Sequence, residues 1–184
     1  MITGMPGSGK SLIRKAAERL NLPVVSMGDI VRERAILEGV SLTPESLGRL
    51  AVDLRDKYGD DIIAKLTIDK ILKDGLNRLK VVVIEGVRSW SEVESFQRAF
   101  GRTVIVAVHA PRKVRFKRLV VRKRRDDPRN WKEFEERDER ELEWGIGKVI
   151  AFSDYIILNY EHKNIEEVIR EAEDLIRSIV KEGC

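Results

Sequence analysis

The sequence predicts an α/β fold of three layers, with a five-stranded parallel sheet between two layers of helices. Apolar runs that fit buried strands alternate with amphipathic segments that fit helices, which is the pattern of a parallel sheet. Residues 80–85 form the clearest strand, because a continuous β-branched run indicates burial on both faces. A chain of 184 residues suits one domain, which we expect to span residues 1–184.

The first half of the chain contains two of the predicted strands and four helices. The strands are predicted at residues 1–3 and 23–27, and the helices at about residues 11–20, 28–37, 43–58 and 62–73. The first helix carries apolar side chains at helical spacing. Gly39 ends the second helix, and Thr43 is a good N-cap for the third because a proline follows it.

The second half of the chain contains the other three strands. They are predicted at residues 80–85, 103–108 and 155–158, and helices are predicted at about residues 89–100, 111–125, 131–150 and 164–181. Ser89 or Ser91 can cap the first of these helices, and Asn164 can cap the last. The order of the strands in the sheet does not follow from this pattern.

Residues 4–11 carry the chemistry around which the chain is organised. They read G-M-P-G-S-G-K-S and fit the phosphate-binding pattern G-x-x-x-x-G-K-[ST]. Glycines let the backbone curl so that its N–H groups point at phosphate oxygens, and the helix that follows presents its positive end to the same anion. The predicted phosphate-binding residues are Gly4, Gly7, Ser8, Gly9, Lys10 and Ser11. Lys10 would reach the β- and γ-phosphates and Ser11 would ligate Mg²⁺, so ATP and Mg²⁺ are the expected cofactors.

A second candidate site lies at the end of the third strand. Glu85 closes an apolar strand and precedes Gly86, a position where phosphate-loop enzymes hold Mg²⁺, often through water. No second acid follows Glu85, and no N-K-x-D motif for guanine occurs. Both observations point away from hydrolytic motors and guanine-nucleotide switches, and towards transfer of phosphate to a bound acceptor.

The composition also limits the location and the kinds of site that the protein can have. No apolar run approaches the roughly 20 residues of a membrane span, and no signal peptide is visible. The single cysteine, Cys184, has no partner for a disulfide or a metal site. We therefore expect a cytoplasmic protein without a membrane partner; the sequence indicates no oligomeric state.

Four further segments carry a resemblance to known enzymes. They are G-D-I-V-R at residues 28–32, E-G-V-R at 85–88, R-L-V-V-R at 118–122, and R-D-D at 125–127 followed by Arg137. With the phosphate loop (P-loop), they resemble the nucleoside monophosphate kinase superfamily, which includes adenylate kinase and, more distantly, dephospho-coenzyme A kinase. The chain is most similar to archaeal P-loop kinase-like proteins described as dephospho-coenzyme A kinase-related or adenylate kinase-like. It shares with them the G-V-R-S turn, the A-V-H-x-P strand end and the G-I-G before the last strand.

The resemblance implies a phosphotransferase that moves the γ-phosphate of ATP to a nucleotide or a nucleotide-like small molecule. Arginine suits such a site because its planar fork matches phosphate oxygens and stays charged. The implied catalytic set is Lys10, Arg88, Arg118, Arg122 and Asp29. The implied acceptor-binding residues are Asp29, Arg32 and Arg88, with a helical cover over about residues 28–75. Arg118, Arg122, Arg125 and Arg137 would belong to a lid over about residues 112–148.

Two acceptor classes remain open. The G-D-x-x-R spacing fits nucleoside monophosphates, whose phosphate needs no general base. Residues 153–159, S-D-Y-I-I-L-N, resemble the close of dephospho-coenzyme A kinases, which act on a ribose hydroxyl and place an aspartate base after the second strand. That strand here ends in Ser26 and Met27. Asp29 could be the base, a helix-start anion, an acceptor ribose contact or a plain N-cap.

The basic run from Arg112 to Arg125 supports an alternative of another class. Its density of cations could bind an RNA backbone, which would make the chain an RNA-associated P-loop ATPase without a small-molecule acceptor. Phe116 is the only aromatic residue in the run, so no base-stacking platform is evident, and we consider nucleic acid the less favoured partner.

Overall fold

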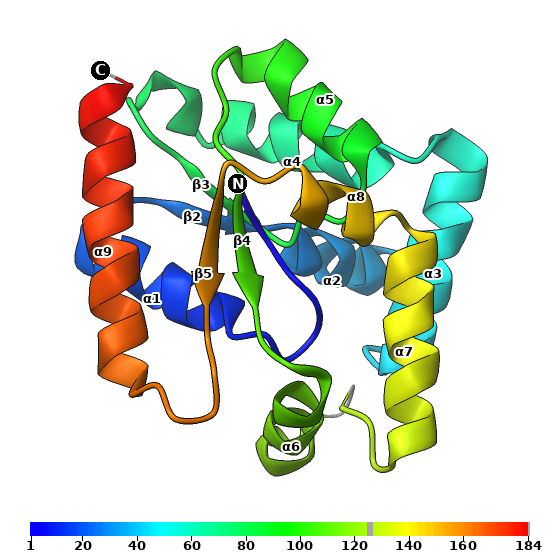
Figure 1. The fold of residues 1–184 in the computed structure, drawn as a ribbon. Helices are drawn as coiled ribbons and strands as arrows, with labels where there is room; N and C mark the ends of the chain where they lie inside the picture. Colours follow the sequence, from blue (N-terminus) through cyan, green and yellow to red (C-terminus); the bar gives the residue numbers. More distant parts are fainter. Residues whose placement is uncertain (125–126, 184) are drawn as a thin grey trace.

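The computed structural model describes residues 1–124 and 127–183. Its centre is a five-stranded, all-parallel sheet in the order β2-β3-β1-β4-β5, which confirms the predicted fold class (Figure 1). The strands are β1 Ile2–Thr3, β2 Val24–Ser26, β3 Val83–Glu85, β4 Val106–His109 and β5 Tyr155–Leu158. Because β1 lies between β3 and β4, the segments that leave these three strands meet at one edge of the sheet.

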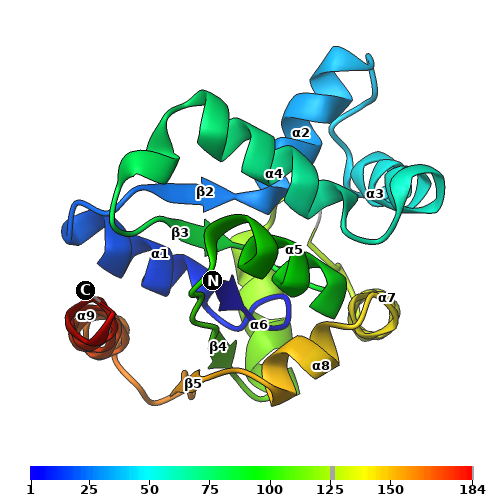
Figure 2. The ribbon, with the colours of Figure 1, turned by 90° about the horizontal axis from the view of Figure 1, so that it is seen from above.

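Helices cover both faces of the sheet (Figure 2). They are α1 Lys10–Arg19, α2 Met27–Leu37, α3 Pro44–Tyr58, α4 Ile62–Lys73, α5 Trp90–Phe100, α6 Arg112–Arg122, α7 Trp131–Glu143, α8 Ile146–Ala151 and α9 Ile165–Glu182, with a 3₁₀ turn, η1, at Leu76–Arg78. On one face α1 packs against α9, and on the other α4 packs against α5 and α5 against α8. The result is the three-layer arrangement that the sequence predicts.

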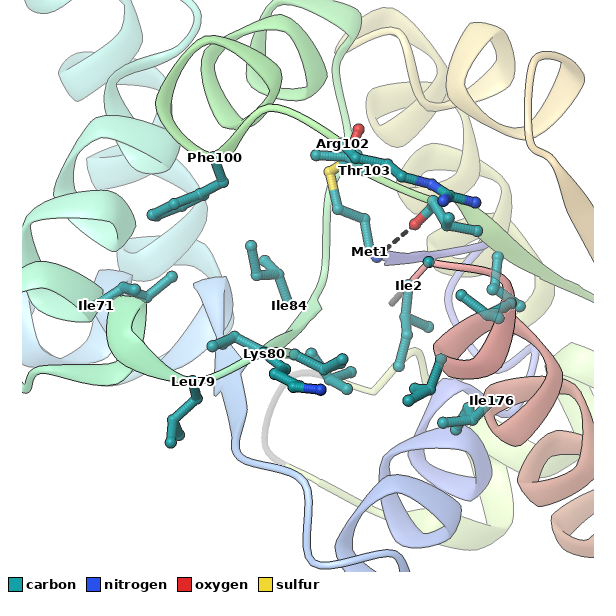
Figure 3. Close-up of a pocket in the computed structure, with 18 of the residues that line it drawn as sticks. Met1, Ile2, Ile71, Leu79, Lys80, Ile84, Phe100, Arg102, Thr103 and Ile176 are labelled. Atoms are coloured by element: carbon teal, nitrogen blue, oxygen red, sulfur yellow. Dashed lines mark hydrogen bonds between the residues drawn. The ribbon is translucent and has the colours of Figure 1, made fainter.

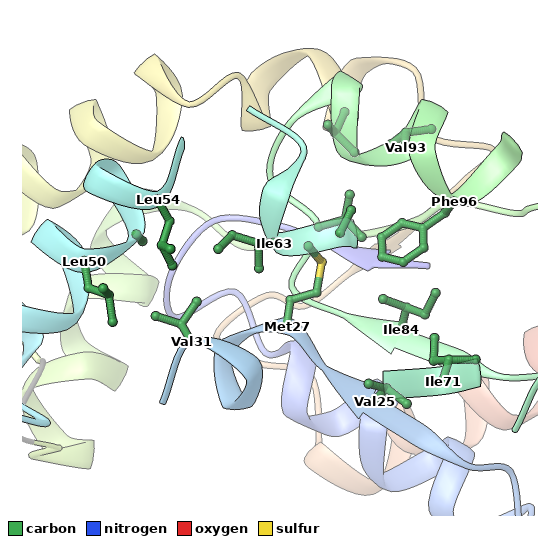
Figure 4. Close-up of a cluster of buried hydrophobic side chains, with 14 of the residues drawn as sticks. Val25, Met27, Val31, Leu50, Leu54, Ile63, Ile71, Ile84, Val93 and Phe96 are labelled. Carbon is green, nitrogen blue, oxygen red and sulfur yellow. The ribbon is translucent and has the colours of Figure 1, made fainter. Parts of the chain in front are cut away.

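Two apolar clusters hold these layers together. The cluster beneath α1 and α9 includes Ile13 and Ile169, both buried. The larger cluster joins β2 and β3 to the helices on the other face, and Figure 4 shows Met27, Ile84 and Phe96 within it. Burying side chains of this size contributes about 1.5–3 kcal/mol each. The two clusters therefore hold the helices against the sheet, and the loops that follow the strands start from this stable base.

Several predicted helix starts are confirmed by their caps. The Thr43 side chain accepts the Ser46 N–H at the start of α3. Ser89 and Asn164 each form a complete capping box, with glutamates three residues later. The second helix differs from the prediction, because Ser26 is its N-cap and α2 begins at Met27.

Other boundaries also differ, for identifiable reasons. The predicted helix 131–150 is two helices, since Gly145 has φ +94°, a left-handed conformation that interrupts the helix between α7 and α8. Within the predicted helix 111–125, α6 ends at Arg122, and Lys123 follows with φ +51°. Strands β3 and β4 start later than predicted, because the paired register of β3 begins at Val83 opposite β2 and that of β4 at Val106 opposite Ile2.

Candidate functional site

The phosphate loop runs from β1 into α1 at the carboxyl edge of the sheet, and its glycines are required by close packing. A Cβ atom on Gly4, whose φ is +140°, would lie 2.4 Å from the carbonyl oxygen of Val108. A Cβ atom on Gly9, whose φ is +106°, would lie 2.1 Å from Nδ2 of Asn159. The loop is therefore held between β4 and the segment that follows β5, and larger residues would displace it.

Lys10 lies across this loop. Its Nζ donates to the carbonyl oxygens of Gly4 at 2.5 Å and Met5 at 3.3 Å. Burial lowers the pKa of Lys10 from its ordinary 10.5 to about 8; Glu141 opposes this change and Arg88 adds to it. The lysine thus shares its surroundings with groups from two distant segments.

Arg88 and Glu141 form the centre of those surroundings. Arg88 Nε donates to Glu141 Oε2 at 2.8 Å, and the Glu141 side chain is only 7% exposed. Arg88, Lys10 and Arg137 together outweigh the effect of burial and hold the pKa of Glu141 below its ordinary value. The structure therefore brings together Lys10, Arg88 and Arg137 from the predicted set, around a carboxylate that sequence reasoning did not single out.

A second buried ion pair supports the Arg88 turn. Arg55 of α3 bonds Glu92 of α5 at 3.0 Å, and Glu92 is fully buried. The other Glu92 oxygen accepts the backbone N–H groups of Arg88 and Ser89, at 2.7 and 3.2 Å. Trp144 lies 5.0 Å from the Arg55 guanidinium and 5.6 Å from that of Arg88. The spacing of serine and glutamate in the capping box could have indicated Glu92; no local pattern indicates Arg55.

Asp29 and Arg32 pair with each other on α2. Arg32 NH1 donates to Asp29 Oδ1 at 2.6 Å, and the aspartate side chain is half exposed. Arg14, which sequence reasoning missed, lies 3.8 Å from Asp29 Oδ2 and 3.6 Å from Glu85 Oε2. Since Ser26 caps α2, Asp29 is not its N-cap, and that interpretation of Asp29 is wrong.

Arg118 of the basic helix contacts the phosphate loop and the end of β5. Its guanidinium donates to Asn159 Oδ1 at 2.9 Å and lies 3.5 Å from the carbonyl oxygen of Ser8. Asn159 donates to the same Ser8 carbonyl at 2.8 Å. Asn159 closes the S-D-Y-I-I-L-N segment, and its position after the last strand was the only signal for it.

Two of the other predicted lid arginines, Arg122 and Arg137, lie near Asp127. Arg122 donates to both Asp127 oxygens, at 2.9 and 2.5 Å, and Arg137 NH1 lies 3.6 Å from Oδ1. Arg125 lies outside the described residues. Arg122 and Arg137 thus meet at one aspartate, whereas Arg118 binds elsewhere.

Arg115 also belongs to the structure of the site, although the sequence did not distinguish it from its basic neighbours. It is buried and donates to both oxygens of Asp138 at 2.7 and 2.6 Å, and to the carbonyl oxygen of Pro6 at 3.1 Å. One side chain therefore connects α6, α7 and the phosphate loop.

The predicted magnesium ligands suit a metal held by few protein groups. Ser11 is in the first turn of α1 and is exposed, and the Glu85 side chain is 17% exposed at the end of β3. In residues 1–124 and 127–183, no group of three or more His, Cys, Asp or Glu is arranged to hold a metal ion. Mg²⁺ in nucleotide sites keeps waters and phosphate oxygens as most of its ligands, so one hydroxyl and one carboxylate fit it.

A cavity of about 590 Å³ lies at the opposite edge of the sheet. Figure 3 shows Ile84 and Phe100 among its apolar lining. The N-terminal amino group of Met1 donates to the Val104 carbonyl oxygen at 2.6 Å. The cavity lies near the amino ends of β1, β3 and β4 and so is separate from the phosphate loop.

Together, the parallel sheet, the glycine-rich loop and its lysine define a P-loop nucleotide-binding domain with a kinase-like fold. The sequence matches the family described as "AAA domain" over residues 3–135. It is 47% identical to a UPF0200 protein of Thermococcus onnurineus over 99% of this chain and 98% of that protein. It is 44% identical to the UPF0200 protein PH1008 of Pyrococcus horikoshii over 98% and 96% of the two chains. The chain belongs to the UPF0200 family.

Solved structures share the fold. TT1252 from Thermus thermophilus superposes with a TM-score of 0.65 at 18% identity, covering 96% of this chain and 94% of that one. Shikimate kinase from Aquifex aeolicus superposes with a TM-score of 0.52 at 24% identity, covering 100% and 98%. At these identities the likeness describes architecture alone. No helix in the described residues has the length and apolar character needed to cross a bilayer.

Proposed function

We propose that this chain is an ATP- and Mg²⁺-dependent phosphotransferase that moves the γ-phosphoryl group to a nucleotide or nucleotide-like small molecule. The observation that carries the proposal is the bond of 2.8 Å between Arg88 and the buried carboxylate of Glu141, which also interacts electrostatically with Lys10 of the phosphate loop and with Arg137. These cations come from α1, the turn after β3, and α7. Phosphoryl transfer depends on positioning and on neutralising charge that spreads over phosphate oxygens, which convergent cations supply.

In this proposal the loop backbone and Lys10 hold the β- and γ-phosphates. Ser11 and Glu85 hold Mg²⁺, whose chemistry there is to neutralise the phosphate oxygens. Arg118 of α6 has its guanidinium near Ser8 of the phosphate loop, so it can contact the phosphates of the donor nucleotide. Asp29, Arg32 and Arg88 face the acceptor, with residues 28–75 as its cover and residues 112–148 as the lid.

The contacts of α6 favour this function over RNA binding. Lys117 pairs with Glu161 at 2.7 Å, Arg112 with Glu135 at 3.3 Å, and Arg115 with Asp138. Because these carboxylates neutralise their partners, they reduce the positive electrostatic potential that would attract an RNA backbone to α6. The described basic residues therefore act largely within the fold.

The test is a transfer assay with the full chain, ATP and Mg²⁺ against nucleoside monophosphates, nucleosides and dephospho-coenzyme A, with products separated by chromatography. We expect one acceptor class to gain phosphate, and we expect Lys10→Ala to abolish the transfer without unfolding the protein. Lys15→Ala, an exposed change on the same helix, is the control. Slow ATP hydrolysis with no acceptor product, together with salt-dependent RNA binding, would instead support the RNA-associated ATPase.

A further inference from the structure

Glu141 is a carboxylate among the cations that are proposed to bind phosphate groups. It is buried, it accepts the Arg88 Nε–H at 2.8 Å, and its charge opposes the lowering of the Lys10 pKa by burial. A purely phosphate-binding pocket gains nothing from a negative charge at its centre, because the carboxylate repels the ligand. Glu141 orients Arg88, and a carboxylate at this position is also available for a chemical role.

The two arginines assigned to the acceptor are both engaged by carboxylates. Arg88 is bonded to Glu141, and Arg32 is bonded to Asp29 at 2.6 Å. An acceptor phosphate would have to compete with a carboxylate for each of them. An uncharged hydroxyl has no such conflict, and it needs a group that takes its proton during transfer.

Glu141 is better placed for that task than Asp29. The side chain of Asp29 is half exposed and lies against Arg32 and Arg14, whereas Glu141 is buried beside Lys10. The charged groups around Glu141 are Lys10 of α1, Arg88 of the turn after β3, and Arg137 of α7. The donor phosphates neutralise Lys10 when they bind, so the Glu141 carboxylate becomes more basic when the donor is present.

We infer that the acceptor presents a hydroxyl group and that Glu141 takes its proton. This inference rests on the proposed phosphotransferase function. In the step, the acceptor oxygen bonds to the γ-phosphorus and its proton passes to a Glu141 oxygen. The bond between the γ-phosphorus and the β,γ-bridging oxygen breaks, and ADP leaves with that electron pair.

The first experiment identifies the bond that the enzyme makes. Phosphorus NMR of the product distinguishes a phosphoester, formed on a hydroxyl, from a phosphoanhydride, formed on a phosphate. The panel contains nucleosides and dephospho-coenzyme A as hydroxyl acceptors, and nucleoside monophosphates, which offer both groups. A phosphoester supports the inference. A phosphoanhydride overturns it and leaves the phosphotransferase function intact, while no product from any acceptor overturns both.

The second experiment tests Glu141 itself. Glu141→Gln keeps the size and an oxygen that can accept from Arg88, but it loses the ability to take a proton. We expect kcat to fall by about 10²–10⁴-fold, with the Kd for ATP unchanged or tighter because a negative charge beside Lys10 is gone. Glu143→Gln, an exposed change on the same helix, should leave both values unaltered.

Three results would overturn the role of Glu141. In the first, kcat of Glu141→Gln stays within tenfold of the unmodified enzyme. In the second, kcat is kept and ATP affinity or Mg²⁺ dependence is lost, which assigns the residue to the donor. In the third, Asp29→Asn removes the transfer while Glu141→Gln does not, which assigns proton transfer to Asp29.

Discussion

The side-chain amide of Asn159 donates to the carbonyl oxygen of Ser8 at 2.8 Å and thereby ties the end of the last strand to the phosphate loop. Asn159 is buried, and its Oδ1 accepts from Arg118 at 2.9 Å. One amide thus orients the loop backbone and an arginine of α6. The loop conformation depends on residues more than 150 positions away as well as on its own glycines.

Asn159→Ala should weaken nucleotide binding. It removes the donor to Ser8 and the acceptor for Arg118, so we expect the Kd for ATP to rise several-fold and the free energy of unfolding to fall by about 1–3 kcal/mol. Calorimetric titration and urea unfolding measure the two effects. The control is Asn164→Ala, which removes the cap of α9 and should cost about 1 kcal/mol of stability while ATP affinity stays the same. Equal ATP affinity in both variants would contradict the role of Asn159.

The charge of Lys10 should make nucleotide binding depend on pH. Its pKa is lowered to about 8, mainly by burial, and phosphate binding requires the protonated amine. The Kd for ATP should therefore change little from pH 7 to 8 and then rise, by at most about tenfold per pH unit. Titrations between pH 7 and 9.5 measure this, and Lys15→Ala should show the same profile.

The same shift has an opposite consequence for stability. The unfolded chain keeps the Lys10 proton to about pH 10.5, whereas the free native protein loses it near pH 8. The free energy of unfolding should therefore gain a stabilising contribution from Lys10 as pH rises from about 8 to 10.5. In Lys10→Met this contribution is absent, and an unchanged pH dependence in that variant would count against the assignment.

Arg55→Ala should destabilise the protein strongly. It removes the ion-pair partner of the fully buried Glu92, which costs about 3–5 kcal/mol in comparable cases. Thermal and urea unfolding measure the loss. Arg49→Ala, on the same helix, breaks only an exposed contact of 3.8 Å with Glu45 and should cost less than about 1 kcal/mol. Similar losses in the two variants would mean that the buried pair contributes little.

Arg88→Ala should impair the use of the acceptor without impairing the binding of ATP. Arg88 contacts Glu141 and Trp144, so under the proposed function we expect kcat to fall or the acceptor KM to rise, with ATP affinity nearly unchanged. Steady-state kinetics with both substrates varied, alongside direct ATP titration, provide the measurement. Arg98→Ala, whose side chain is 65% exposed on α5, is the matched control. If ATP affinity alone falls, Arg88 belongs to the donor side.

Local signals predicted much of the fold. Thr43, Ser89 and Asn164 start helices where their side chains suggest, because a cap depends on residues only three positions away. The five parallel strands follow from apolar runs between helices. Strand limits were less accurate, because a ladder ends where its neighbour ends, and that neighbour is distant in the sequence.

The residues of the candidate site also fall into two groups, those that the sequence identifies and those that only the packing identifies. The residues of the phosphate loop belong to one contiguous motif, so the sequence identifies them directly. Glu141 and Arg115 lie in charged segments where every turn offers a similar side chain, and only packing selects the buried ones. Trp144 and Arg55 meet through the approach of α3 to the end of α7, which no spacing along the chain encodes.

The bonds of Arg115 fix the position of α6 relative to α7. Its guanidinium joins α6 to Asp138 of α7 and to the Pro6 carbonyl, so the two helices cannot part without breaking a buried ion pair. A loss of that kind costs about 3–5 kcal/mol, which makes separation rare at equilibrium. The two helices should therefore keep one fixed arrangement, and because the same guanidinium binds the Pro6 carbonyl, any displacement of α6 and α7 would also displace the phosphate loop.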